Sequence, residues 1–499
     1  LGALTSLSLP PYNYFLINFI TIGLFFMYIF QKKKLYKKRY SFLYGWFFGF
    51  GYFLTNLYWI TLSLTFDKDF IILIPISLIL IPAFLALFYG VITLSFYYCN
   101  FKNLVSAFFL FSVLFGSIEF IRGNILTGFP WNLIIYSFSK NLSFLSFISV
   151  IGTYSFNLIV ISLFSAPAIY ILRKSKKEII VCILLLLMPI IFFSYDLSYK
   201  KKFLDSKVKE NSFIIRVIGA NISLNRFYKK IEAEKVINEL IDISSPDQKK
   251  DIFFLWPEGI IPNTYQDQLS LYKDLFANNF NQNHLIGIGI TSRSSEKDKT
   301  KYFNSFSVFD NNLNLIKNYN KINLVPFGEF LPLENFLNKI GLKIITNNIG
   351  SFTKGSERKI IEIDKESLKF KFLPLICYEI IYSGKLTKSY DFDFILNISE
   401  DGWFGNSIGP KQHFAHGIFR ALETGKYIVR SSNNGVAAII NPLGIVEEKI
   451  AFGETGFIDF DKRKVIEPTL FSIYGNKIFI ILILMYIFLI FSFNTSKND

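Results

Sequence analysis

The sequence predicts an α/β domain held between membrane-spanning helices. Of the 499 residues, 51% are hydrophobic and only 18% are charged, whereas charged residues make up about 25% of a typical soluble protein. Residues 1 to 198 and 477 to 493 are almost entirely apolar, while residues 199 to 476 hold most of the acids, amides and glycines. We therefore expect a transmembrane bundle at 1–198, a polar domain at 199–476, and a C-terminal transmembrane helix with a short cytoplasmic tail at 477–499.

Seven segments are apolar over a length that suits a bilayer, which needs roughly 20 helical residues. They lie at about 13–30, 41–64, 70–98, 103–121, 144–172, 178–195 and 477–494. An eighth lies at 1–9. The chain begins without an initiator methionine, so we expect a few N-terminal residues to be missing and this segment to be truncated. Pro75 and Pro82 predict a kink or a strong tilt in the segment at 70–98.

Basic residues predict the orientation of the bundle. The net charge is +15, and many lysines lie in short runs beside apolar segments, as in "QKKKLYKKR" (31–39) and "RKSKK" (173–177). With a cytoplasmic N-terminus both runs fall in cytoplasmic loops, as the positive-inside rule requires. The polar domain then lies outside, in the periplasm of a bacterium with two membranes, and the charge needs no nucleic-acid partner.

The connecting segment at 122–143 is too polar to cross a membrane and too apolar for a free loop. One interpretation places it at the outer interface near the polar domain, with Phe129 and Trp131 as anchors. A simple connecting loop is the equal alternative.

The polar domain alternates strand-like and helix-like patterns, which is typical of a single α/β layered domain. Amphipathic helices are predicted at 226–244 and 411–427. Short apolar runs predict strands at 212–223, 251–256, 284–292, 304–310, 370–378, 392–399 and 435–444.

Three cysteines provide no disulfide framework. Cys99 and Cys182 lie inside apolar segments, so only Cys377 belongs to the polar domain. A lone thiol in such a position either packs a core or attacks a substrate.

Polar residues at the ends of predicted strands favour the second role for Cys377. Glu258 follows one buried strand, Lys321 and Glu329 lie in "NKINLVPFGEFLP", and Glu379 comes two residues after the cysteine. A carboxylate can take the thiol proton and return it to a leaving group, and a lysine ammonium can stabilise a thiolate and an oxyanion. Glu258, Lys321 and Cys377 supply one group of each kind.

The blocks "LWPEG", "NKINLVPFGEFLP" and "LICYE" resemble the Glu, Lys and Cys blocks of the nitrilase (carbon-nitrogen hydrolase) superfamily. Together with the membrane segments and with "DGWFGNSIGPKQHFAHGIFRALETGKYIVRSSNNGVAAIINPLG", the chain is similar over nearly its whole length to the apolipoprotein N-acyltransferase family. The resemblance implies a nitrilase-like αββα sandwich joined to a bundle of about eight transmembrane helices in the bacterial inner membrane.

The resemblance also implies a two-step reaction without a cofactor or a metal. Cys377 would attack an ester of a phospholipid and form a thioester with its acyl group. The α-amine of an S-diacylglyceryl cysteine on an apolipoprotein would then take this acyl group as an amide. Glu258 would act as base and then acid, and Lys321 would stabilise the oxyanion. Glu329, Tyr378 and Glu379 would support the site.

Two loops are candidates for a lid or an acyl groove: "EDGWFGNSIGP" (400–410) and "EFLPLENFLNKIGLKIITNNIG" (329–350). Trp403 and Phe404 in the first loop either contact lipid or pack a core.

Three alternatives remain. The first is a papain-like enzyme that uses His413 or His416 as its base, which would leave Glu258 and Lys321 unexplained. The same two histidines have a spacing that can hold a metal, but no third ligand is evident. His284, at the start of a strand, is expected to be structural. The chain could also be a membrane-tethered amidase, or a scaffold with an inactive enzyme domain.

Overall fold

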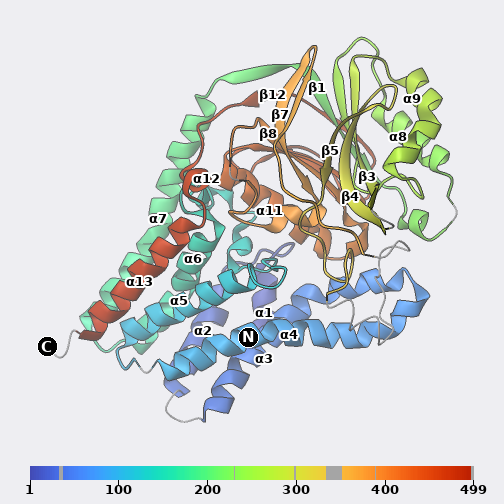
Figure 1. Ribbon diagram of the computed structural model, residues 1–499. Helices are drawn as coiled ribbons and strands as arrows, with labels where there is room; N and C mark the ends of the chain where they lie inside the picture. Colours follow the sequence, from blue (N-terminus) through green and yellow to red (C-terminus); the bar gives the residue numbers. More distant parts are fainter. Residues whose placement is uncertain are drawn as a thin grey trace.

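The computed structural model describes residues 1–32, 37–99, 101–229, 231–296, 299–332, 351–387 and 389–495. A helical bundle lies against a sheet domain, and both the first seven helices and the last helix belong to the bundle (Figure 1). The sheet domain therefore joins the bundle at both ends.

The bundle agrees approximately with the eight predicted helices. Its helices are α1 (Gly2–Thr5), α2 (Ile17–Lys32), α3 (Lys38–Leu57), α4 (Ile74–Tyr98), α5 (Leu104–Arg122), α6 (Ile148–Leu172), α7 (Lys176–Leu204) and α13 (Lys477–Thr495). Within the described part of the chain, five stretches are long and apolar enough to cross a membrane, at 68–98, 104–122, 148–172, 176–204 and 477–494, and α2 is a shorter apolar helix. Between α3 and α4 the chain forms the 3₁₀ turns η2 (Tyr58–Thr65) and η3 (Lys68–Leu73), so the predicted third span ends early.

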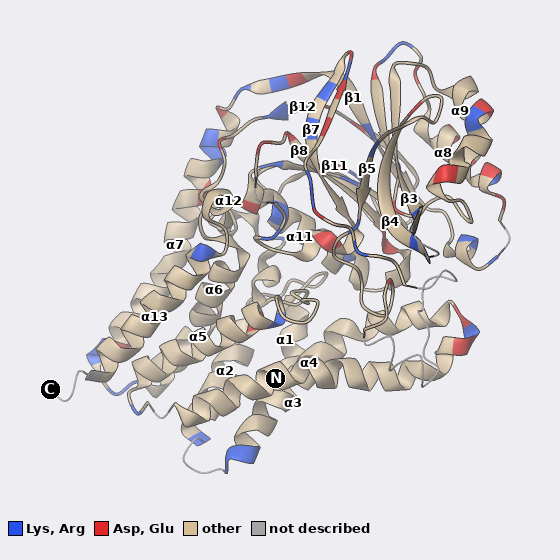
Figure 2. Cartoon of the chain, viewed as in Figure 1, with Lys and Arg blue, Asp and Glu red and all other residues tan. Residues whose placement is uncertain are grey.

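Charged residues are sparse along the bundle and frequent over the sheet domain (Figure 2). Helix α7 runs directly into the first strand of the sheet domain, so its first residue, Lys176, lies at the opposite end of the bundle. The basic run at 173–177 is thus far from the sheet domain.

Helices α3 and α4 approach closely at Gly45. A Cβ atom at this position would lie 2.1 Å from the carbonyl oxygen of Tyr89 and 2.3 Å from Oγ1 of Thr93. Small residues permit such close packing between membrane helices.

We expect Gly45→Ala to destabilise the protein by about 1–3 kcal/mol, because a backbone carbonyl must shift to admit the methyl group. Thermal unfolding in detergent measures the loss. Gly23→Ala in α2 is the matched control, since its Cβ would meet only an ordinary contact, 3.5 Å from the carbonyl oxygen of Phe164. Equal unfolding temperatures for the two variants would contradict the close approach.

Within the described residues the sheet domain contains twelve strands: β1 (Val208–Ala220), β2 (Ile252–Leu255), β3 (His284–Glu296), β4 (Lys299–Asp310), β5 (Leu315–Asn320), β6 (Ile361–Lys365), β7 (Leu368–Ile376), β8 (Phe394–Glu400), β9 (Tyr427–Asn433), β10 (Ala437–Ile440), β11 (Val446–Ile450) and β12 (Gly456–Lys464). The order is β5-β4-β3-β2-β1-β9-β8-β7-β6, with β12 beside β1, and with β10 and β11 continuing from β9. Only two residue pairs join β1 to β9, so the strands form two halves linked at one end.

Alternate residues of each strand face different layers. Phe253 and Leu255 of β2 pack in one core with Phe370 and Phe372 of β7, whereas Phe254 faces a second core. The first core therefore lies between the two halves, as in a sandwich of two sheets.

Helices cover both outer faces of this sandwich. Helices α8 (Ala233–Ser244) and α9 (Lys273–Asn279) contribute to the core on the first half, and α11 (Gly409–Thr424) lies on the second half. The predicted helix at 226–244 begins only at Ala233, because Arg226 is held in a 3₁₀ turn by Glu400 and by the carbonyl of Gly259. The result is the predicted αββα arrangement.

The α11 layer shares its core with the bundle. Phe419 and Leu422 of α11 belong to the same apolar cluster as residues of α2 to α7. Glu423 also caps a break in α6, where Gly152 has φ 77° and the Thr153 N–H donates to Glu423 Oε1 at 3.0 Å. The bundle and the sheet domain are therefore packed together on this face.

The segment at 122–143 fills the junction between bundle and sheet domain. It forms turns that include η4 (Ile134–Phe138) and η5 (Leu142–Phe144). Its predicted place near the polar domain is confirmed, but the expectation that Trp131 anchors the segment in lipid is wrong. Trp131 is 2% exposed and stacks on His413 of α11, because the packed junction removes it from the bundle surface.

Candidate active site

Three strand ends bring the predicted catalytic residues to one region. Glu258 follows β2, Lys321 follows β5, and Cys377 follows β7 directly. Cys377 has φ 47°, a left-handed conformation that is uncommon for a residue with a side chain. Such a conformation persists only where the surroundings hold it, and all three side chains are buried, with exposures of 7%, 1% and 8%.

Lys321 lies between two carboxylates. Its Nζ is 3.0 Å from Glu258 Oε1 and 2.9 Å from Glu329 Oε1. Asn304 bridges the same two oxygens, because its Nδ2 donates to Glu258 at 2.7 Å and to Glu329 at 2.6 Å. The second oxygen of Glu258 accepts the Glu400 N–H at 3.0 Å. One ammonium and one amide thus fix the orientation of both acids.

The electrostatics of the cluster favour a protonated thiol at Cys377. Burial raises the pKa of the Cys377 thiol well above its ordinary value, Glu258 raises it further, and Lys321 opposes them. Burial alone would lower the pKa of Lys321, but Glu258, Glu329 and Cys377 raise it well above its usual range. Burial raises the pKa of Glu329 against the effect of Lys321. The thiol therefore needs a base to become a nucleophile.

Glu379 ties the Lys321 loop to the end of β7. Its carboxylate accepts the Ile376 N–H at 2.9 Å and the Ile322 N–H at 2.9 Å, and it pairs with Arg358 Nη2 at 2.7 Å. Burial acts to raise the pKa of Glu379, but Arg358 and the backbone donors hold it below its ordinary value. Glu379 thus fixes the positions of Ile322, Ile376 and Arg358 relative to one another.

Tyr378 connects the predicted nucleophile to the bundle. Its hydroxyl donates to the Gly128 carbonyl at 3.0 Å, and the hydroxyl of Tyr382 donates to the Thr127 carbonyl at 2.9 Å. Both acceptors belong to the segment at 122–143. The residue next to Cys377 is therefore held by the bundle.

Trp403 and Phe404 meet aromatic residues of the bundle region. Trp403 lies edge-on to Phe66, with ring centroids 5.8 Å apart, and Phe404 lies edge-on to Trp59 at 4.8 Å. The loop at 400–410 thus packs on the bundle in this structure. Of the other predicted lid loop, residues 333–350 lie outside the described residues.

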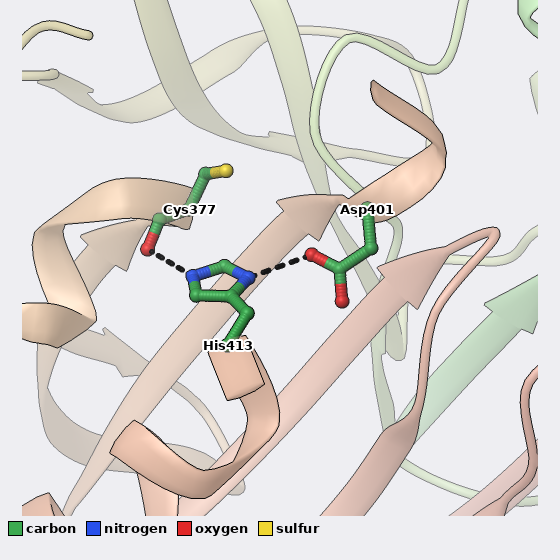
Figure 3. A group of neighbouring side chains, drawn as sticks. All are labelled: Cys377, Asp401 and His413. Carbon is green, nitrogen blue, oxygen red and sulfur yellow. Dashed lines mark hydrogen bonds and ion pairs between the residues drawn. The ribbon is translucent and has the colours of Figure 1, made fainter. Parts of the chain in front are cut away.

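His413 lies between Asp401 and Cys377 (Figure 3). Its Nδ1 is 2.8 Å from Asp401 Oδ1, and its Nε2 is 3.2 Å from the carbonyl oxygen of Cys377. Donor atoms of these three residues lie within 4.8 Å of one another, close enough to consider a metal ion. However, Arg430 Nη2 already lies 2.7 Å from Asp401 Oδ2 and 3.2 Å from His413 Nδ1. This guanidinium supplies the positive charge, so the geometry favours a hydrogen-bonded cluster.

The other histidines lie apart from this cluster's hydrogen bonds. The ring of His416 packs against Trp131 and Tyr136. His284 is fully buried in the sheet domain, where Nδ1 accepts the Asn281 N–H and Nε2 lies 3.0 Å from the Asp247 carbonyl.

Sequence reasoning did not identify Asn304 or Arg358 as members of the site. Asn304 was included only as the first residue of a predicted strand, where its neighbours alternate between polar and apolar. The one available signal was an amide on a strand that is otherwise half-buried, and such residues are common without a functional role.

Comparisons with known proteins identify the family. Residues 1–166 match the family described as the apolipoprotein N-acyltransferase N-terminal domain, and residues 244–461 match the carbon-nitrogen hydrolase family. The chain is 32% identical over 507 residues to the apolipoprotein N-acyltransferase of Rickettsia prowazekii, covering 98% of both chains. It is 29% identical to that of Rhizobium leguminosarum bv. trifolii, covering 92% of this chain and 88% of the relative. Among solved structures, Saccharomyces cerevisiae Nit3, of the nitrilase superfamily, is 16% identical, with a TM-score of 0.34 over 50% of this chain and 90% of that chain.

The fold and the family matches define a membrane-bound acyltransferase with a carbon-nitrogen hydrolase domain. The chain belongs to the apolipoprotein N-acyltransferase family.

Proposed function

We propose that this enzyme transfers an acyl chain from a phospholipid, through a thioester on Cys377, to the α-amine of the S-diacylglyceryl cysteine of apolipoproteins. The observation that carries the proposal is the similarity to a named apolipoprotein N-acyltransferase over 98% of both chains. The contact of Tyr378 with the bundle supports it, because a nucleophile beside the membrane region can reach both the phospholipid and the lipid-anchored apolipoprotein.

In the first step Glu258 takes the proton of the Cys377 thiol, and the sulfur attacks the ester carbonyl of the phospholipid. Lys321 stabilises the oxyanion of the tetrahedral intermediate. Collapse of the intermediate breaks the ester bond, and Glu258 returns the proton to the departing alkoxide, so that a lysophospholipid leaves and the thioester remains. Glu329 holds Lys321 in place.

In the second step the α-amine attacks the thioester and Glu258 takes a proton from the attacking nitrogen. The carbon-sulfur bond breaks, the thiolate recovers a proton and the product is an amide. Burial of Cys377 limits the access of water, which would otherwise hydrolyse the thioester.

We place the enzyme in the bacterial inner membrane with the catalytic domain on the periplasmic side. The basic run at 173–177, remote from the sheet domain, supports this orientation. In the same proposal residues 1–198 form the transmembrane bundle, 199–476 the catalytic domain and 477–499 the last transmembrane helix with its tail.

The test is the mass of the purified protein after incubation with a phospholipid of known chain length. We expect an acyl increment on Cys377 that a diacylglyceryl-cysteine peptide discharges, and no increment in Glu258→Gln, because the thiol then lacks its base. Glu448→Gln, at an exposed position of β11, is the matched control. Release of ammonia from small amides without a phospholipid adduct would instead identify an amidase. Unchanged transfer by Cys377→Ser would overturn the mechanism.

A further inference from the structure

The left-handed backbone of Cys377 is fixed from two sides. On its N-terminal side the Ile376 N–H donates to Glu379 at 2.9 Å. On its C-terminal side the carbonyl of Cys377 lies 3.2 Å from His413 Nε2. The proposed mechanism uses Glu379 as support and leaves His413 without a role.

The geometry determines which atom of His413 carries a proton. A carbonyl oxygen only accepts hydrogen bonds, so the contact with Cys377 requires a proton on Nε2. With Nε2 protonated, the neutral ring leaves a lone pair on Nδ1, which accepts from Arg430 Nη2 at 3.2 Å, and the same guanidinium holds Asp401 at 2.7 Å. The Asp401 carboxylate, which also accepts the Ser399 hydroxyl at 2.6 Å, lies 2.8 Å from Nδ1 and hydrogen-bonds to it directly only when Nδ1 is protonated as well. A ring nitrogen that meets a fixed partner keeps the whole imidazole in one orientation.

Aromatic packing restricts the same ring. Trp131 stacks on His413 with centroids 5.4 Å apart and an interplanar angle of 18°, and Phe404 packs nearly perpendicular to the same ring with centroids also 5.4 Å apart. Both His413 and Asp401 are fully buried. Since Trp131 belongs to the segment at 122–143, the junction with the bundle also limits the motion of this histidine.

We propose that Asp401 and His413 form a positioning pair, in which the Nε2–H of His413 holds the carbonyl of Cys377 and so directs the sulfur toward Glu258 and Lys321. The proposal rests on the proposed acyl transfer through Cys377. His413 touches the backbone of the nucleophile and takes no proton from the thiol.

Two substitutions of His413 separate positioning from base catalysis. Glutamine can place an N–H near the position of Nε2, whereas the shorter asparagine reaches only the position of Nδ1. A misplacement of about 1 Å at a reacting group slows a reaction by roughly 10²-fold. We therefore expect His413→Asn to slow formation of the acyl adduct on Cys377 by about 10²-fold, and His413→Gln to recover most of that loss.

His416→Asn is the matched control, because His416 lies on the same helix, is equally buried and packs on Trp131, while the contact with the Cys377 carbonyl comes from His413. Thermal unfolding of all three variants in detergent measures the purely structural cost. We expect similar unfolding temperatures for His413→Asn and His416→Asn, with slow acylation only in the first.

The pH dependence of Cys377 alkylation by iodoacetamide provides a readout that needs no phospholipid. A positioning residue leaves the midpoint of this profile in place, whereas loss of a base moves it. The titratable or charged groups that face His413 are Asp401, Arg430, Cys377 and His416, and His413→Asn leaves all four of them in place.

A shifted midpoint would overturn the proposal, as would equal loss of acylation in the glutamine and asparagine variants, or full activity of His413→Asn. Failure of the wild-type protein to form an adduct would count against the proposed function, and the alkylation profiles would still test the positioning.

Discussion

Replacing Lys321 with methionine is expected to slow formation of the acyl adduct on Cys377 by about 10²–10³-fold, the usual cost of removing one group that stabilises an oxyanion. The substitution also leaves Glu258 and Glu329 facing each other without the ammonium that lies 3.0 and 2.9 Å from them. Two buried carboxylates in contact do not both stay ionised, so the proposed base loses part of its capacity to accept a proton. Time-resolved intact mass after mixing with phospholipid measures the rate.

Lys317→Met is the matched control, because this lysine lies on β5, the strand that Lys321 directly follows, but is exposed. Its acylation rate should equal that of the wild-type protein. Acylation of Lys321→Met at the wild-type rate would show that the ammonium takes no part in the chemistry.

Glu379→Gln is expected to lower the free energy of unfolding by about 3–5 kcal/mol, the usual cost of breaking a buried ion pair by removing one partner. The substitution leaves Arg358 without its carboxylate and replaces one accepting oxygen by an amide that only donates. Ile376 and Ile322 then compete for the remaining oxygen. Denaturation followed by tryptophan fluorescence measures the difference, and acylation should fall as well, because both loops of the site are released.

The pH dependence of this stability has a definite sign. The pKa of Glu379 is lower in the folded protein than its ordinary value. Its ionised form therefore stabilises the fold fully above the unfolded pKa of about 4.3, and the contribution disappears as the pH falls through the lower folded value. The difference between wild type and Glu379→Gln should thus be constant near neutral pH and shrink in acid. Glu448→Gln should show no such difference, and a gap that widened on acidification would contradict the predicted sign.

The sequence allowed much of the architecture to be predicted. Apolar length identified most of the bundle helices, and the strands at 251–256 and 284–292 were close to β2 and β3. The weaker predictions concern places where long-range contacts decide the local structure. Helix α8 starts late because Arg226 pairs with Glu400, which lies 174 residues away along the chain. No periodicity within the segment carries that information.

The catalytic candidates show the same division. Glu258, Lys321 and Cys377 were identified because unusual polar residues follow buried strands, and because the blocks around them resemble those of a known superfamily. Local patterns determined these features: apolar runs predict strands and spans, and a side chain at a strand end has a direction set by the backbone.

Only the tertiary structure decided how these residues are supported. Asn304 bridges two acids from different loops, and Trp131 stacks on His413 instead of facing lipid. The carbonyl of Cys377 contacts a histidine 36 residues further along the chain. Each of these contacts joins segments whose approach is set by the packing of the two sheet halves and the bundle. The sequence by itself determined which chemical groups and elements are present, and the fold decided which groups meet, because hydrogen bonds and stacking depend on distances of a few ångströms that local sequence patterns do not specify.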